Sequence, residues 1–152
     1  MTGRQTALVA AFGSLALMLA AYGFQHIGGM APCKMCIWQR YPHVVAIMVG
    51  GVIYFAHNKF LAACGALAAA VTSAIGFFHA GVEQGWWEGP STCTSGSISD
   101  MSVDDVFAQI MQAPLVRCDD IPWELFGISM AGWNGVVSLG LCVLWVLAYR
   151  RS

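Results

Sequence analysis

Two pairs of cysteines could carry redox chemistry in this chain, and the first pair is the more informative. Cys33 and Cys36 form a Cys-x-x-Cys motif, which can cycle between a dithiol and a disulfide. Arg40 follows four residues after Cys36, so the two side chains share one face if the segment is helical. Because a nearby fixed positive charge favours the thiolate, the reactive form of cysteine, the motif predicts a redox-active pair.

The second pair, Cys93 and Cys118, lies in the one long polar segment of the chain, which also holds all eight acidic residues. Two functions remain open for it. A bridge there could staple the loop, which would stabilise the fold by roughly 3–4 kcal/mol in the chain-entropy model. It could instead relay electrons by exchange with an external thiolate. Because Ser, Thr, Gly and Asp flank both cysteines, we expect the bridge to be exposed and open to attack.

The remaining cysteines and histidines do not predict a metal or haem site. Cys64 and Cys142 fall within apolar stretches and are expected to be small buried hydrophobic residues. A structural zinc site needs four ligands, commonly including a second close pair, and His26 and His43 lack that spacing. A c-type haem needs histidine after the second cysteine, where this chain has Ile37. We therefore expect no metal.

The composition indicates an integral membrane protein. Of the 152 residues, 58% are hydrophobic and 10% are charged, whereas a soluble domain carries about 25% charged residues. This length suits one compact bundle, so we expect a single domain over residues 1–152. The acidic segment is expected to be solvated, and nothing in its charge favours nucleic-acid binding.

Four apolar stretches are long enough to cross a bilayer as helices, which requires about 20 residues each. The second reaches that length only if it begins near Cys36, with Arg40 directed to the surface or to protein. The first is longer than the 7–15-residue core of a signal peptide, so we expect it to be retained. The expected spans run over about residues 6–25, 37–56, 60–82 and 125–149.

The expected fold is an all-α membrane protein, a bundle of four transmembrane helices. Its two extracytoplasmic loops are expected at about residues 26–36 and 83–124. The second loop contains one helical pattern of apolar residues spaced at i, i+3, i+4, i+7 and i+8. This short amphipathic helix could lie on the membrane surface or pack on the rest of the loop. Its apolar residues are Val103, Val106, Phe107, Ile110 and Met111.

The charges at the ends of the spans suggest an orientation. Four spans place both termini and the 57–59 turn on one side, with four basic residues against three on the other side. The positive-inside rule then makes the termini cytoplasmic. We expect both cysteine-bearing loops to face the periplasm of a bacterial inner membrane, where disulfides persist.

Three features together resemble a known family. They are the motif running from Cys33 to Arg40, the Cys93 and Cys118 pair in the long second loop, and the segment from Trp123 through Trp133 at the start of the last span. The chain is similar over nearly its whole length to the bacterial disulfide bond formation protein B family, DsbB.

This resemblance implies an activity, in which a periplasmic thioredoxin-like donor of the DsbA type is oxidised and two electrons pass to a membrane quinone, ubiquinone or menaquinone. By position, Cys93 would form the mixed disulfide with the donor and Cys118 would exchange with Cys33. Cys36 would face the quinone, with Arg40 beside a quinone carbonyl oxygen.

The resemblance also suggests that His79 could help to protonate the quinone. We favour instead a histidine packed at the helix interface.

Three other functions are weaker alternatives. A vitamin K epoxide reductase-like enzyme runs related chemistry on four helices, but that resemblance would place the quinone-side motif near the last span. A non-enzymatic membrane protein could hold purely structural bridges, in which case quinone would not co-purify with it. A zinc-binding membrane module would be recognised by metal analysis.

Overall fold

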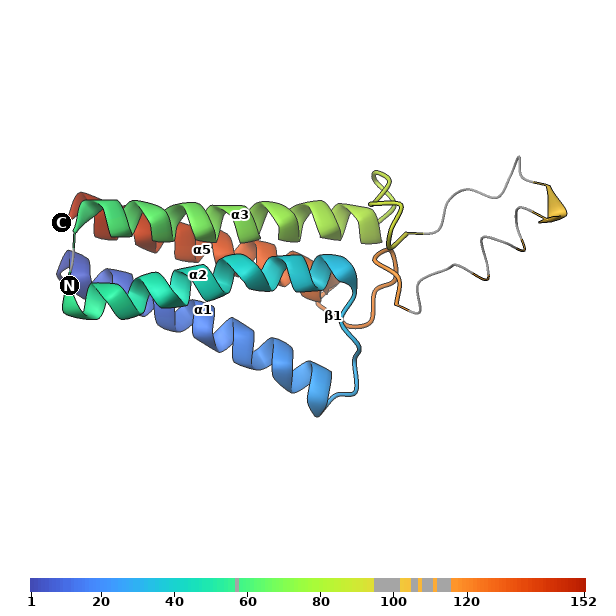
Figure 1. Ribbon diagram of the computed structural model, residues 1–152, viewed down its shortest axis with the longest axis horizontal. Helices are drawn as coiled ribbons and strands as arrows, with labels where there is room; N and C mark the ends of the chain where they lie inside the picture. The colour runs from blue at the N-terminus through green and yellow to red at the C-terminus, as the bar shows by residue number, and fades with distance from the viewer. Residues whose placement is uncertain (57, 95–101, 105–106, 108–110, 112–115) are drawn as a thin grey trace.

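Four long helices lie side by side in a computed structural model that describes residues 1–56, 58–94, 102–104, 107, 111 and 116–152. The N-terminus, the C-terminus and the connection between the second and third helices lie at one end of the bundle (Figure 1). The loops that carry the cysteine pairs lie at the other end. The four helices are α1 (Gly3–His26), α2 (Lys34–Phe55), α3 (Lys59–Glu83) and α5 (Met130–Arg150).

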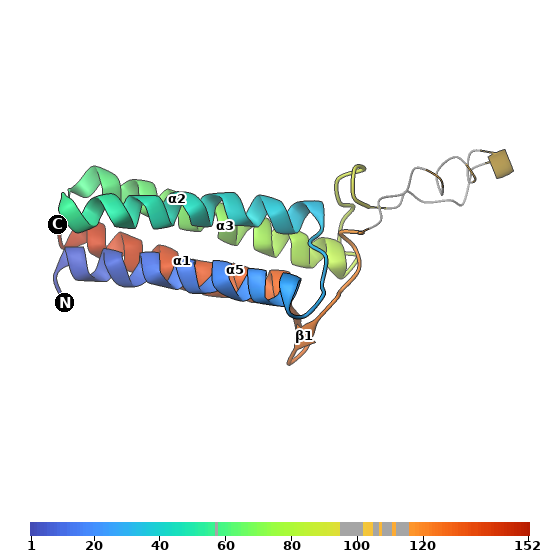
Figure 2. The ribbon, with the colours of Figure 1, turned by 60° about the horizontal axis from the view of Figure 1, so that its bottom comes forward.

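The helices form two layers, with α2 and α3 above α1 and α5 (Figure 2). Helix α3 packs against α2 and α5, and α1 packs against the same two helices, so α1 and α3 lie diagonally across the bundle. Toward its C-terminal end α1 tilts away from α2 (Figure 1). The bundle is therefore tight at the end that holds the termini and wider at the end that holds the cysteines.

Small residues fill the tight part of the bundle. Ala7, Ala46, Ala62 and Ala69 are buried there around the large side chain of Trp145. Small side chains let helix backbones approach closely, which is how helices associate in lipid, where the surroundings are as apolar as the core.

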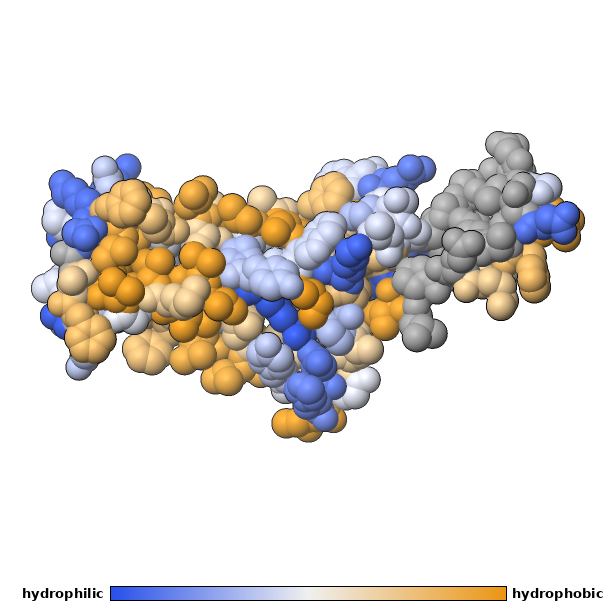
Figure 3. Space-filling model, viewed as in Figure 1, coloured by the Kyte–Doolittle hydropathy of each residue, from blue (hydrophilic) through white to orange (hydrophobic). Residues whose placement is uncertain are grey.

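The outer surface of the bundle is apolar, as the membrane assignment predicts. On the face shown in Figure 3, a hydrophobic band covers the helices between two more hydrophilic ends. Among the described residues, α1, α3 and α5 are long and apolar enough to cross a membrane. Helix α2 falls outside this group because polar residues, among them Gln39, Arg40 and His43, occupy its N-terminal half. The chain is thus a mostly helical protein with the character of a membrane protein.

The last helix begins later than the sequence predicts. Residues 124–129 form a hairpin in which β1 (Glu124–Leu125) pairs antiparallel with β2 (Ile128–Ser129). Phe126 and Gly127 turn the chain there with φ values of 54° and 73°. Helix α5 starts only at Met130, because the Ser129 hydroxyl accepts a hydrogen bond from the backbone of Gly132 and caps the helix.

The predicted amphipathic helix stays a prediction. Two of its five apolar residues, Val106 and Ile110, lie outside the described residues. Val103, Phe107 and Met111 are described, and their side chains are exposed.

Candidate active site

The Cys33–Cys36 pair sits at the start of helix α2. Cys33 is the N-cap residue, and its sulfur accepts a hydrogen bond from the backbone nitrogen of Cys36 at 3.1 Å. The two Sγ atoms lie 2.6 Å apart. The hydrogen bond to Cys36 and burial raise the pKa of the Cys33 thiol. The shared proton therefore stays on Cys33, and the negative charge is left to Cys36, at the positive end of the helix dipole.

The second pair forms a disulfide, but it is not exposed. Cys93 and Cys118 are 1% and 0% exposed, so the expectation of an open bridge is wrong. The polar flanks do not cover it. Instead, the bridge packs in one apolar cluster with Cys33, Met35 and Val82 at the ends of α2 and α3. The backbone nitrogen of Cys118 also donates to the carbonyl oxygen of Cys93 at 2.7 Å. Both cysteine pairs therefore belong to one buried cluster.

His79 of α3 lies between the two pairs. Its side chain is 2% exposed. The amide nitrogen of Gln39 donates to His79 Nδ1 at 2.9 Å, so the ring proton is on Nε2. Nε2 donates to the carbonyl oxygen of Cys118 at 3.1 Å and lies 3.6 Å from Cys33 Sγ. His79 is thus packed at the helix interface, as we favour from the sequence, and also touches both cysteine pairs.

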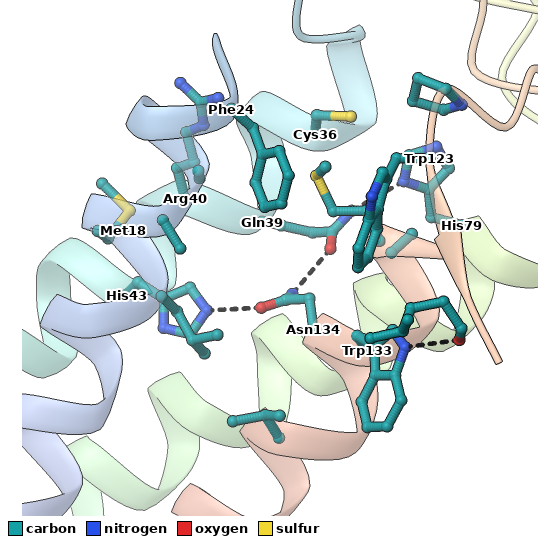
Figure 4. Close-up of a pocket in the computed structure, with 18 of the residues that line it drawn as sticks. Met18, Phe24, Cys36, Gln39, Arg40, His43, His79, Trp123, Trp133 and Asn134 are labelled. Atoms are coloured by element: carbon teal, nitrogen blue, oxygen red, sulfur yellow. Dashed lines mark hydrogen bonds between the residues drawn. The ribbon is translucent and has the colours of Figure 1, made fainter. Parts of the chain in front are cut away.

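A chain of polar side chains continues from His79 into the bundle. His43 Nε2 donates to Asn134 Oδ1 at 2.9 Å. Asn134 Nδ2 donates to Gln39 Oε1 at 2.7 Å, and Gln39 then reaches His79 (Figure 4). Thr72 supports the chain by accepting from Asn134 and donating to the carbonyl oxygen of Gln39. Each amide has one orientation that satisfies every partner, so this network fixes the tautomer of His79.

Arg40 faces helix α1. Its Nη1 donates to Gln25 Oε1 at 2.7 Å, and its guanidinium lies over the ring of Tyr22, 4.9 Å from the ring centre. These contacts anchor the C-terminal part of α1 to α2. Figure 4 shows Arg40 and His79 on opposite sides of Cys36.

Cys36, Arg40 and His79 line one cavity of about 350 Å³. It lies where α1 tilts away from α2, and most of its wall is apolar. An apolar pocket with a few convergent polar groups is typical of a small-molecule site. All four helices and the hairpin region contribute to its lining, which comprises Leu17, Met18, Ala20, Ala21, Phe24, Cys36, Gln39, Arg40, His43, His79, Glu83, Pro122, Trp123, Leu125, Phe126, Met130, Ala131, Trp133, Asn134 and Val137.

One acidic residue lines the same cavity. The side chain of Glu83, the last residue of α3, is 2% exposed. Its Oε1 lies 3.8 Å from His79 Nε2, whereas Oε2 has no hydrogen-bond partner among the described residues. Burying a carboxyl oxygen without a partner is costly, so its presence in the cavity needs a reason.

Comparison with known proteins identifies the family to which the chain belongs. Residues 3–148 match the family model described as Disulfide bond formation protein DsbB. The chain belongs to this family. It is 33% identical to a Disulfide bond formation protein B of Albidiferax ferrireducens, with 93% of this chain and 86% of the relative aligned. It is 32% identical to one from Shewanella sp. (strain ANA-3), over 88% of this chain and 79% of that relative.

Membership in the DsbB family confirms the resemblance found in the sequence. It implies a disulfide bond formation protein, hence an oxidoreductase that generates disulfides. Together with the three apolar helices, it also implies a protein of the bacterial inner membrane.

The structure gathers the four loop cysteines, Arg40 and His79 around one cluster and cavity, and leaves the other two cysteines out. Cys64 and Cys142 do not line the cavity, and Cys142 Sγ contacts the carbonyl oxygen of Ala66 within the bundle. Their roles, and those of the gathered residues, stay predictions.

Sequence reasoning missed Gln39, His43, Glu83 and Asn134. A signal existed, because polar or ionisable residues within or at the ends of apolar spans mark functional sites by default.

Proposed function

We propose that this protein is a thiol:quinone oxidoreductase, which re-oxidises a periplasmic DsbA-like dithiol protein and passes the electrons to membrane quinone. One observation carries the proposal. The Cys33–Cys36 pair lies between a buried disulfide on one side and an apolar cavity on the other. A pair placed in this way can exchange with the disulfide and also deliver electrons to a molecule in the cavity.

The cavity suits a quinone head group. Its wall offers aromatic side chains from Phe24, Trp123 and Trp133, which match a flat apolar ring. The guanidinium of Arg40 can donate a hydrogen bond to an oxygen that gains negative charge. A quinone bound there would accept two electrons and two protons and become a quinol.

The thiol steps follow from the buried cluster. A donor thiolate attacks Cys93 Sγ and releases Cys118 as a thiolate, and the second donor thiol then completes the donor's own disulfide. Cys118, now reduced, exchanges with Cys33 of an oxidised Cys33–Cys36 pair, with which it shares the cluster. Because Cys93 is buried, the loop has to open before a donor can reach it.

The energetics favour quinone as the final acceptor. A DsbA-type donor has a potential near about −120 mV, which is already strongly oxidising. Soluble disulfides cannot readily take electrons from it, because their reduction potentials are lower. Each 30 mV of additional driving force contributes about 1.4 kcal/mol for this two-electron couple.

The same proposal fixes the topology. All four helices, α2 included, cross the inner membrane as one domain, with the termini cytoplasmic and both cysteine-bearing loops periplasmic. The polar residues of α2 are accommodated because they face protein and the cavity.

A zinc site is the second candidate, because ligand atoms of Cys33, Cys36 and His79 lie within 4.8 Å of one another. Two thiolates on a tetrahedral zinc at about 2.3 Å would place their sulfurs roughly 3.8 Å apart. The observed 2.6 Å is much closer to a disulfide, so the geometry favours redox exchange. Metal analysis of the purified protein distinguishes the two functions.

Cys36→Ser tests the proposal directly. In stopped-flow mixing with reduced donor and quinone, wild type should produce quinol, and the variant should lose quinol formation by at least about 100-fold while Cys93 still forms a mixed disulfide with the donor. Cys142→Ala, a cysteine outside the cavity, is the matched control and should retain activity. Normal quinone turnover in Cys36→Ser, or none in wild type, would sink the proposal.

A further inference from the structure

We propose that Glu83 is a catalytic residue of this site, the acid that gives a proton to a quinone oxygen as the Cys33–Cys36 pair is oxidised. This inference rests on the proposed thiol:quinone function and deepens it. The Cys-x-x-Cys motif does not point to Glu83. The contacts of its carboxyl group do.

The environment of Glu83 favours the neutral, protonated form of its carboxyl group. Its side chain is buried, it lines the cavity, and Oε2 lacks a hydrogen-bond partner among the described residues. Because an isolated buried carboxylate is costly, the group is most stable with a proton, and that proton can be placed on the unpaired oxygen. The free O–H then needs an acceptor, which a quinone oxygen would supply.

The other polar groups of the cavity are less suited to give a proton. A guanidinium is a poor acid, and that of Arg40 is engaged by Gln25. The Nε2 proton of His79 is donated to the carbonyl oxygen of Cys118, and that of His43 is donated to Asn134. Glu83 is the described cavity acid whose proton is not committed to a protein acceptor.

The charges around Glu83 are compatible with this role. His79 faces it from the same helix, with Nε2 3.8 Å from Oε1. Cys36, from α2, lines the same cavity. A thiolate at Cys36 disfavours a second negative charge nearby, so it helps to keep Glu83 protonated until electrons leave the sulfur.

The proton balance closes within this cluster. With Cys36 as a thiolate, oxidation of Cys33 and Cys36 forms one S–S bond and releases two electrons and the single proton of Cys33. A quinone needs two electrons and two protons to become a quinol, so Glu83 supplies the other proton and becomes a carboxylate. Cys33 Sγ and Glu83 Oε1 lie 3.6 and 3.8 Å from His79 Nε2, so both proton donors belong to one group of contacts. Such contacts tighten when the substrate is bound.

Glu83→Gln is the decisive variant, because it keeps the size of the side chain but removes the acid. Glu88→Gln is the matched control, since Glu88 is exposed and receives the same chemical change. The first measurement uses the pre-reduced protein without quinone. Infrared difference spectra should show the carbonyl band of one buried protonated carboxyl group in wild type and Glu88→Gln, and no such band in Glu83→Gln.

The second measurement mixes the same pre-reduced proteins with a short-tailed quinone in single-turnover experiments. At saturating quinone, Glu83→Gln should oxidise about 100-fold more slowly than wild type, within the range for general acid catalysis. Glu83→Asp should recover part of the rate. In wild type the rate should fall at high pH as Glu83 loses its proton, whereas in Glu83→Gln this fall should disappear. Exchange of Cys93 with the donor should be unchanged in all variants.

Three outcomes are distinguishable. If wild type does not reduce quinone, the proposed function itself is wrong. If wild type reduces quinone and Glu83→Gln has the same rate and pH profile, only the role of Glu83 is overturned. A missing infrared band in wild type would also overturn it, because Glu83 would then carry no proton to give.

Discussion

At the scale of single residues, the position of Cys33 as a helix cap makes the two sulfurs of the motif unequal. Cys33 accepts the backbone hydrogen bond that starts α2, and it packs in the cluster with the Cys93–Cys118 bridge. Cys36, one turn into the helix, lines the cavity instead. The three-residue spacing therefore directs one sulfur toward the disulfide partner and the other toward the cavity.

The two proposed roles of Arg40, anchoring α1 and contacting quinone, should be separated by a conservative substitution. Arg40→Lys keeps a positive charge but loses the planar group that lies over Tyr22 and reaches Gln25. We expect the KM for quinone to rise about threefold to tenfold, with little change in donor exchange at Cys93. Steady-state kinetics with varied quinone measure this change.

Gln25→Ala is the control for the contact between the helices. It removes the partner of Arg40 on α1 but leaves the guanidinium in the cavity wall. If Gln25→Ala raised the KM as much as Arg40→Lys, then Arg40 would act by holding α1 rather than by contacting quinone.

At this scale the sequence pointed to the candidate reactive residues but not to the side chains that contact them. A Cys-x-x-Cys motif followed by arginine has a recognisable spacing, so Cys33, Cys36 and Arg40 could be found directly. The partner of His79 could not, because Gln39 lies 40 positions away in sequence and meets His79 only through helix packing. The burial of the Cys93–Cys118 bridge was likewise hidden, since it depends on the ends of α2 and α3 rather than on its polar neighbours.

At the scale of elements, the helices were predictable from hydropathy and their ends were not. Lipid selects long apolar stretches, which the sequence displays plainly. The ends depend on caps, and Cys33 is an unusual one, so α2 begins at Lys34 rather than near residue 37. The hairpin before α5 depends on Phe126 and Gly127 in left-handed conformations, which apolarity alone does not reveal.

The contact between α3 and α5 should tolerate no added carbon at Gly76. A Cβ there would lie 2.8 Å from the backbone nitrogen of Gly135 and 2.9 Å from the carbonyl oxygen of Ala131. Because these are backbone atoms, the helices would have to separate, at a cost of about 1–3 kcal/mol. We expect Gly76→Ala to lower the temperature of irreversible unfolding in detergent and to disturb the nearby cavity.

Gly140→Ala is the matched substitution on α5. A Cβ at Gly140 has no neighbour within 4 Å, and alanine favours helix by up to about 1 kcal/mol relative to glycine. We expect equal or slightly greater stability. Equal unfolding temperatures for the two variants would show that the close approach at Gly76 does not limit packing.

At the scale of the whole molecule, the bundle has two chemically different ends. The termini and the turn between α2 and α3 occupy one end, and the cysteine cluster, the cavity and the acidic segment occupy the other (Figure 1). The cavity is lined by residues of α1 and α2 in the half of the bundle where α1 tilts away from α2. A donor from the aqueous phase and a quinone from the bilayer could therefore approach the same cysteine pair from different sides.

This polarity predicts which end is accessible from the periplasm. We would place a single reporter cysteine at each end, as Glu88→Cys in the acidic segment and Ser152→Cys at the C-terminus, both at exposed positions. In intact cells with only the outer membrane permeabilised, an impermeant maleimide should label Glu88→Cys and leave Ser152→Cys unlabelled. After lysis of the inner membrane both should react. The parent protein gives the background, because its disulfide cysteines are buried and protected. Labelling of Ser152→Cys before lysis would invert the topology, and it would place the cysteine cluster in the cytoplasm, where a DsbA-type donor could not reach it.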